Sequence, residues 1–181
     1  MNGGNVSSPT DILPPERLRA EHDASGFANG KHASLDRWLK ERTLASEGLS
    51  ARIYVICRIA APLTIVGYYA ISTAMEERQA LPSAKLRRGM PNQIPLLLIG
   101  RLALDASVQG NGLGADLLSD AVRRCCAAAQ IAGARAIAAH AIDDDAAGFY
   151  ARHGFVRTTL GERVLRLPIK IARRALAGEV D

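Results

Sequence analysis

The chain is poor in the features that mark secreted, membrane-spanning or metal-binding proteins. It has three cysteines, Cys57, Cys125 and Cys126. Because their number is odd and no pair has metal-ligand spacing, we expect buried thiols in a reducing cytoplasm, with neither a disulfide framework nor a metal site. No apolar run reaches the roughly 18 residues that a transmembrane helix needs, and no signal peptide opens the sequence. We therefore expect a soluble, cytoplasmic protein without membrane contact.

Aromatic residues are also scarce, at 4% of the chain, whereas 48% of its residues are hydrophobic. The core is therefore expected to be aliphatic and rich in alanine. A length of 181 residues suits one domain with its own core. The net charge of +5 favours an anionic partner such as a nucleic acid or a phosphorylated cofactor, although a basic surface without a specific partner has the same composition.

Apolar periodicity, interrupted by glycine and proline turns, predicts a mixture of strands and helices. Strands are expected at 11–18, 52–59, 63–72, 96–104, 134–142, 156–158 and 164–167. Helices are expected from a cap at Ser34, from the glycines after residue 109 to Gly133, over 143–152 with Asp143 as its cap, and from Lys170. Residues 76–93 are basic and hold Pro82 and Pro91, so we expect a flexible connection there.

We expect a single folded domain over residues 11–170. Residues 1–10 are rich in glycine, serine and asparagine and are predicted to be disordered, and residues 171–181 are predicted to form a C-terminal tail. Tyr68 and Tyr69 are adjacent in a predicted strand, so they must point to opposite faces. Either one could line a cleft, but packing in the core is an equally good interpretation.

The most informative stretch is a strand ending at Leu104, followed by the glycine-rich turn Gln109–Gly114 and an amphipathic helix. Glycines allow the backbone to approach a ligand, and the free N–H groups of a first helical turn attract phosphate. The turn lacks the Gly-Lys-Ser/Thr of a Walker loop and the glycine spacing of dinucleotide-binding folds. A strand-to-helix turn that simply needs glycine remains the alternative.

Two motifs carry a resemblance to a known family. The pattern Gln109-x-x-Gly112-x-Gly114 resembles the acetyl-CoA signature of GNAT acetyltransferases. One helix and one strand later, a second pattern resembles the second GNAT signature: Asp143-x-x-Ala146-x-x-Phe149-Tyr150-x-x-x-Gly154-Phe155. This resemblance covers about 11–170 and implies the GNAT fold, an α+β arrangement in which helices flank a mixed, mostly antiparallel sheet.

Three further runs, 100–105, 112–118 and 140–144, are similar to the GNAT toxins of bacterial type II toxin–antitoxin pairs. That resemblance implies acetyl-CoA as the cofactor and the α-amino group of aminoacyl-tRNA as the substrate, so that acetylation blocks translation. It also implies a homodimer and neutralisation by a ribbon-helix-helix antitoxin, with DNA bound only through the antitoxin. Gln109 stands where some members carry Arg or His, and Asn29 stands where others carry Cys or Ser.

The resemblance also assigns roles to residues. Tyr150 matches the tyrosine that protonates the departing CoA thiolate. The cofactor-binding positions that it implies are Leu102, Ala103, Leu104, Gln109, Gly110, Asn111, Gly112, Leu113, Gly114, Asp143 and Phe149. Basic segments are expected to bind tRNA phosphates through Lys31, Arg37, Lys40, Arg78, Lys85, Arg87 and Arg88, although a solvated basic face is the default alternative.

The chemistry of the acceptor weakly favours an α-amine. A free α-amino group has a pKa of about 7.7–8.0, against about 10.4 for a lysine side chain, so it needs less help from a general base. No Glu or His is nominated as a base by the sequence. Two other functions remain open: a GNAT enzyme that acts on a small amine or a protein N-terminus, and an RNA- or protein-binding module without catalysis.

Overall fold

The structure is a computed structural model that describes residues 11–158 and 161–178, so the terminus that is predicted to be disordered, 1–10, lies outside the described residues. The chain divides into two compact units, and each is described by itself. Unit 1 comprises Met1–Ala70 and Arg101–Asp120, and unit 2 comprises Ile71–Gly100 and Ala121–Asp181. Three long elements run through both units: β3 (Ala61–Glu77), β4 (Gln93–Leu104) and α3 (Leu113–Ala132).

The strands hydrogen-bond in the order β1-β2-β3-β4-β5-β7-β6, which makes one sheet of seven strands among the described residues. The remaining strands are β1 (Glu16–Arg17), β2 (Arg52–Arg58), β5 (Ala136–His140), β6 (Val156–Arg157) and β7 (Val164–Pro168). The β1–β2, β5–β7 and β6–β7 pairs are antiparallel, whereas β4 and β5 are parallel. The sheet is therefore mixed and flanked by helices, and the predicted fold class is confirmed.

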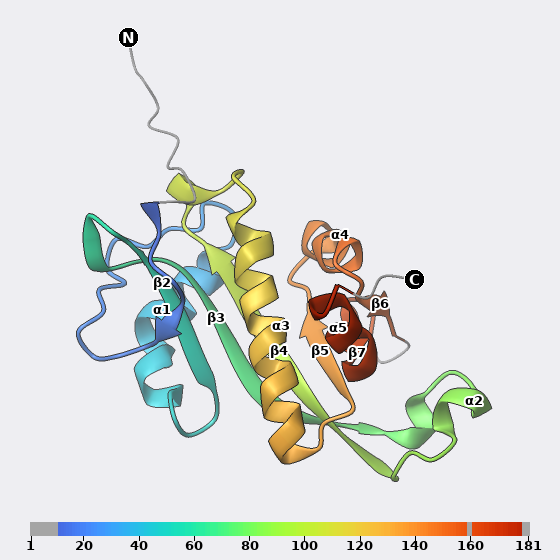
Figure 1. Ribbon diagram of the computed structural model, residues 1–181. Coiled ribbons are helices and arrows are strands. Elements are labelled where there is room, and N and C mark those ends of the chain that lie inside the picture. Colours follow the sequence, from blue (N-terminus) through green and yellow to red (C-terminus); the bar gives the residue numbers. More distant parts are fainter. Residues whose placement is uncertain (1–10, 159–160, 179–181) are drawn as a thin grey trace. The chain divides into compact units, whose positions relative to one another are not determined.

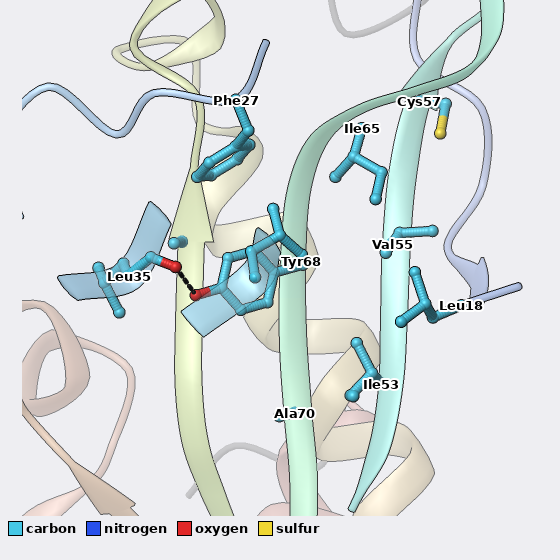
Figure 2. Packing of buried hydrophobic residues seen from close by; sticks show 11 residues of the cluster. Leu18, Phe27, Leu35, Ile53, Val55, Cys57, Ile65, Tyr68 and Ala70 are labelled. Atoms are coloured by element: carbon cyan, nitrogen blue, oxygen red, sulfur yellow. Dashed lines mark hydrogen bonds between the residues drawn. The ribbon is translucent and has the colours of Figure 1, made fainter. Parts of the chain in front are cut away.

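Unit 1 has an apolar core between the β2–β3 strands and helix α1 (Ala33–Ser46), drawn in Figure 2. Tyr68 lies at its centre, and its hydroxyl donates to the main-chain oxygen of Leu35 at 2.9 Å. Tyr69 points to the other face of the strand, where its hydroxyl donates to Asp120 Oδ2 at 2.5 Å. Both tyrosines are fully buried, so they pack in the core and do not line a cleft.

Unit 2 is built on the parallel β4–β5 pair, in register from Leu96 opposite Ala136 to Ile99 opposite Ala139. Helices α4 (Asp144–Arg152) and α5 (Ile169–Leu176) pack against β7, as the orange and red elements of Figure 1 show. Ile169 and Ala172 of α5 are buried. The predicted boundary between domain and tail, at residue 171, therefore falls inside a packed helix.

Two local predictions are wrong. Helix α1 begins at Ala33 with His32 as its N-cap, two residues before the predicted cap at Ser34. The basic connection is also not a featureless loop: it contains a 3₁₀ turn at Arg78–Ala80 and helix α2 (Ala84–Arg87), whose first turn is capped by the Ser83 side chain. Leu81 is 1% exposed and packs in the apolar cluster that includes Ile94. Burial of this side chain stabilises an ordered conformation of the segment although most of its residues are polar.

All three cysteines are free and buried. No helix in residues 11–158 and 161–178 is long and apolar enough to cross a bilayer. In the same part of the chain, no group of three or more His, Cys, Asp or Glu side chains is placed to hold a metal ion.

Candidate functional site

The turn between β4 and α3, residues 109–114, is hereafter the phosphate turn. Gly110 and Gly112 have φ angles of +84° and +80°, a region that side chains other than glycine rarely adopt. A Cβ atom added to either would meet nothing within 4 Å, so the backbone here faces open space. Glycine is therefore required by backbone conformation, and the same conformation leaves room for a ligand against the main chain.

Helix α3 presents its N-terminus at this turn. Hydrogen bonding begins with the N–H groups of Ala115 and Asp116, both of which donate to the Gly112 oxygen. The N–H groups that precede them in a helix have no partner within it, and together with the helix dipole they attract an anion. The geometry thus fits the diphosphate of a cofactor, as the sequence predicts.

Gln109 is exposed, but its side chain is hydrogen-bonded back to the main chain. Its Nε2 donates to the main-chain oxygens of Asn29, at 2.9 Å, and Leu104, at 3.0 Å. Asn29 Nδ2 donates to the same Leu104 oxygen at 3.0 Å. Two carboxamides thus converge on the last carbonyl of β4, which fixes the end of that strand to the phosphate turn.

Asn29 is itself held from both sides. Its N–H donates to Asp36 Oδ1 at 2.8 Å, and its Oδ1 accepts from the His32 N–H at 3.1 Å. At the preceding residue, the Ala28 N–H donates to Asp105 Oδ2 at 2.8 Å. The segment before α1 is therefore a rigid support for the phosphate turn. Sequence reasoning singled out Asn29 only as an unusual residue and missed this role, because the partners that tie it to the phosphate turn, Leu104 and Gln109, are 75 and 80 positions away.

The second predicted cluster lies on α4, in unit 2. Asp143 is the N-cap of this helix, as predicted, and its Oδ1 accepts from the Ala146 N–H at 2.8 Å. Phe149 is half-buried, with its ring centroid 5.5 Å from that of Tyr150. Asp143 therefore sets where α4 begins, and α4 in turn places Tyr150.

Tyr150 is 4% exposed and packs edge-on between the rings of Phe149 and Phe155. Burial raises the pKa of its phenol, so the hydroxyl keeps its proton at neutral pH. The Tyr68 and Tyr69 hydroxyls each have a protein acceptor, whereas that of Tyr150 has none among residues 11–158 and 161–178. The Tyr150 O–H is therefore available to a ligand.

The cations predicted to bind tRNA fall into two sets. In unit 1, Arg37 and Lys40 are exposed on α1, and Lys31 is exposed just before it. In unit 2, Arg78 donates to the Met90 oxygen at 3.3 Å and Arg87 to the Leu81 oxygen at 2.8 Å, so both hold their own loop together. Lys85 and Arg88 are exposed on the same loop.

Arg101, a residue of β4 that sequence reasoning did not single out, lies over the ring of Trp38, 4.4 Å from its centroid. Trp38 in turn stacks on Tyr68 with ring centroids 5.8 Å apart. A cation over an aromatic face is stabilising by about 0.5–1 kcal/mol where the pair is exposed. This stack joins α1 to the strand that precedes the phosphate turn.

Comparison with known proteins shows the family of the chain. The sequence profile of the acetyltransferase (GNAT) domain matches residues 50–157. The chain is 38% identical, over 91% of its length and 96% of the relative's, to a tRNA-acetylating toxin of Mycobacterium tuberculosis (strain ATCC 25618 / H37Rv).

Two solved structures are similar along nearly the whole chain. AtaT complexed with acetyl-methionyl-tRNAfMet is 29% identical with a TM-score of 0.84, covering 92% of this chain and 99% of that one. A tyrosine-to-phenylalanine mutant of AtaT, bound to acetyl-CoA and the C-terminus of the antitoxin AtaR, is 26% identical with a TM-score of 0.77, covering 92% of this chain and 99% of that one. The chain therefore belongs to the GNAT family of acetyltransferases.

Proposed function

We propose that this protein is the toxin of a type II toxin–antitoxin pair and that it transfers an acetyl group from acetyl-CoA to the α-amino group of aminoacyl-tRNA, which blocks translation. One observation carries the choice of substrate: the likeness along nearly the whole chain to a tRNA-acetylating toxin. The phosphate turn and the available hydroxyl of Tyr150 supply the chemistry that such a transfer needs.

Acetyl-CoA supplies an acetyl group activated as a thioester. The phosphate turn would hold its diphosphate through main-chain N–H groups of residues 110–114. Leu102 and Ala103 offer main-chain groups of β4 to the pantetheine arm, whereas the Leu104 oxygen already accepts from Gln109 and Asn29. We therefore assign Gln109 and Leu104 to holding the turn in shape, with the cofactor contacts made by the glycines and by Asn111 and Leu113. Asp143 and Phe149 act on the cofactor site through the placement of Tyr150.

The neutral α-amino nitrogen would bond to the thioester carbon as the C–S bond breaks. Tyr150 would donate its Oη proton to the departing thiolate, and the proton released by the amine nitrogen would pass to solvent, from which the Tyr150 hydroxyl is restored. The raised pKa keeps this donor protonated through the physiological range. The α-amine needs no dedicated base, since its pKa of about 7.7–8.0 leaves a neutral fraction at pH 7.5.

The tRNA contacts in this proposal are phosphate contacts of exposed cations, Arg37, Lys40 and Lys31 in unit 1 and Lys85 and Arg88 in unit 2. Arg78 and Arg87 contribute through the shape of their loop. We further propose a cytoplasmic homodimer that is neutralised by a ribbon-helix-helix antitoxin, with DNA reached only through that antitoxin. Light scattering of the protein alone, and with the product of an adjacent antitoxin gene, tests both assemblies.

The decisive experiment is acetyl transfer from labelled acetyl-CoA to a pool of charged tRNA. We expect label on the aminoacyl group with the wild-type protein, and a loss of at least about 100-fold in kcat for Tyr150→Phe, with acetyl-CoA affinity retained. Tyr68→Phe is the matched control, because it also removes a buried hydroxyl but one that donates to Leu35.

Two outcomes would redirect the assignment. Label on a small amine or a protein N-terminus, with none on tRNA, would support the acetyltransferase activity but reject aminoacyl-tRNA as its substrate. Binding of tRNA without any binding of acetyl-CoA would make the protein a non-catalytic module.

A further inference from the structure

Unit 2 contains a basic groove of which the assignments above use only one residue, Arg88. It has a volume of about 640 Å³ and lies among the α2 loop, the C-terminal end of α3, the start of β5, β7 and α5. Its cations are Arg88, Arg135, Arg166, Lys170 and Arg173, and no acidic side chain lines it. Only Arg88 belongs to the set that the sequence analysis selected. We call this hollow the basic groove and define it by these five cations.

The framework of the groove is fixed by main-chain hydrogen bonds. The Ile169 N–H, at the start of α5, donates to the Arg135 oxygen at 3.1 Å, and the Arg135 N–H donates to the Pro95 oxygen at 2.9 Å. Lys170 and Arg173 are three positions apart on α5 and so share one helix face. Cations from distant parts of the sequence are therefore brought together on a rigid frame.

Most of this charge is not used within the protein. Arg88, Arg135 and Lys170 are exposed and make no ion pair with any of the described residues. Arg173 makes only a long contact, 3.5 Å, to the Cys126 oxygen. Arg166 alone is paired, with Glu76 at 3.2 Å. Four like charges held around one hollow repel each other, and a polyanion would relieve that repulsion.

The composition of the lining favours one kind of polyanion. Four of the five cations are arginines, whose planar guanidinium groups match phosphate oxygens two at a time. No aromatic side chain lines the groove, so it has no platform on which bases could stack. Contacts of this type position a nucleic acid by its backbone without reading its sequence.

We propose that the basic groove binds the phosphodiester backbone of the tRNA body. This inference rests on the proposed function, which supplies a polyanionic substrate, and adds a docking surface to it. The groove contributes to the capture of tRNA and takes no part in acetyl transfer.

The test compares Arg135→Gln/Lys170→Gln with the wild-type protein. The matched control, Arg19→Gln/Arg52→Gln, removes two exposed cations from unit 1. We expect the KM for aminoacyl-tRNA to rise about tenfold in the groove variant, with kcat and acetyl-CoA affinity unchanged. Loss of two phosphate contacts should also flatten the slope of log K against log salt concentration by about 2.

Binding of uncharged tRNA, measured by fluorescence anisotropy, separates this inference from the proposed function. A wild-type protein that binds tRNA through the groove but never acetylates it would retain the groove and reject the function. A groove variant that matches the control in KM, affinity and salt slope overturns the groove and leaves the function standing. Displacement of tRNA by polyglutamate at equal charge concentration would also overturn it, because the groove would then be a site for acidic peptides.

Discussion

The side-chain amide of Gln109 donates to the main-chain oxygen of Asn29 at 2.9 Å and to that of Leu104 at 3.0 Å. One residue thus joins the segment before α1, the end of β4 and the phosphate turn. Since main-chain N–H groups bind phosphate only when they are held in the right orientation, this tie acts on cofactor binding without touching the cofactor. Gln109 and Asn29 are therefore positioning residues.

Replacing Gln109 by Ala removes both hydrogen bonds and loosens the turn. Each bond of this kind contributes about 1 kcal/mol, so the loss of both should weaken acetyl-CoA binding by roughly 30-fold, as measured by isothermal titration calorimetry. Gln109→Glu should be worse, because it sets a carboxylate against two carbonyl oxygens. Gln130→Ala, an exposed glutamine on α3, is the control. Equal affinities for all three variants would contradict the positioning role.

The two buried tyrosines Tyr68 and Tyr150 should respond oppositely to removal of the hydroxyl. Tyr68→Phe leaves the Leu35 oxygen without its donor, so the free energy of unfolding should fall by about 1 kcal/mol while activity is retained. Tyr150→Phe loses no protein hydrogen bond among the described residues, so stability should be retained while activity is lost. Urea unfolding and acetyl transfer measured on the same samples test this contrast. A variant that loses both properties together would contradict it.

Local patterns in the sequence predict much of this structure. Asp143 was predicted to cap α4 and does so, and the glycines after Gln109 were predicted to open α3, which begins at Leu113. These features depend on residues within one helical turn of each other, so their cause lies in the local sequence. The expected orientation of Tyr68 and Tyr69 to opposite faces follows from strand geometry in the same way.

The features that were missed depend on contacts between distant residues. The start of α1 at Ala33 is set with help from the Asn29 side chain, which is also bonded to Leu104 on another element. The basic groove needs Arg88 and Arg173 to lie around one hollow, which no local pattern encodes. A single sequence does not show which distant residues lie together. The sequence therefore predicts a basic surface, but of the five groove cations it selects only Arg88.

A buried ion pair in unit 2 makes a separate prediction about stability. The Glu76 side chain is 2% exposed, and its Oε2 lies 3.2 Å from Arg166 Nη1. This ion-pair contact does not have hydrogen-bond geometry, and neither Glu76 Oε2 nor Arg166 Nε makes a hydrogen bond among the described residues. Removing one partner leaves the other charge buried and unpaired, so Glu76→Gln should lower the free energy of unfolding by about 3 kcal/mol.

Two further variants test whether the loss of stability arises because the Glu76–Arg166 pair is buried. In the exposed pair of Arg163 and Asp144, Arg163→Gln should cost less than about 1 kcal/mol. The double variant Glu76→Gln/Arg166→Met should recover part of the loss, because no unpaired charge remains. If Glu76→Gln unfolds at the same urea concentration as the wild-type protein, the pair does not stabilise the fold.

The buried thiols predict a loss of stability at alkaline pH. Burial raises the pKa of Cys57 from 9.0 to about 11 and that of Cys125 to about 12. As pH rises above 9, the unfolded chain loses these protons first, so the native state binds more protons and the free energy of unfolding falls. The decline should reach about 1.4 kcal/mol per pH unit for each thiol between pH 9 and 11.

Urea unfolding under reducing conditions, at half-unit steps from pH 8 to 10.5, measures this slope. Cys125→Ala should reduce the slope of the free energy of unfolding against pH by the contribution of one thiol. The smaller side chain can lower stability at every pH without changing this result, because the slope reports only the protons released on unfolding. Buried Tyr68 and Tyr150, whose pKa values are also raised, steepen the decline as pH approaches and passes 10, because phenols of the unfolded chain ionise there. A free energy of unfolding that stays level from pH 8 to 10.5 would show that the thiols ionise as readily in the native state as in the unfolded chain.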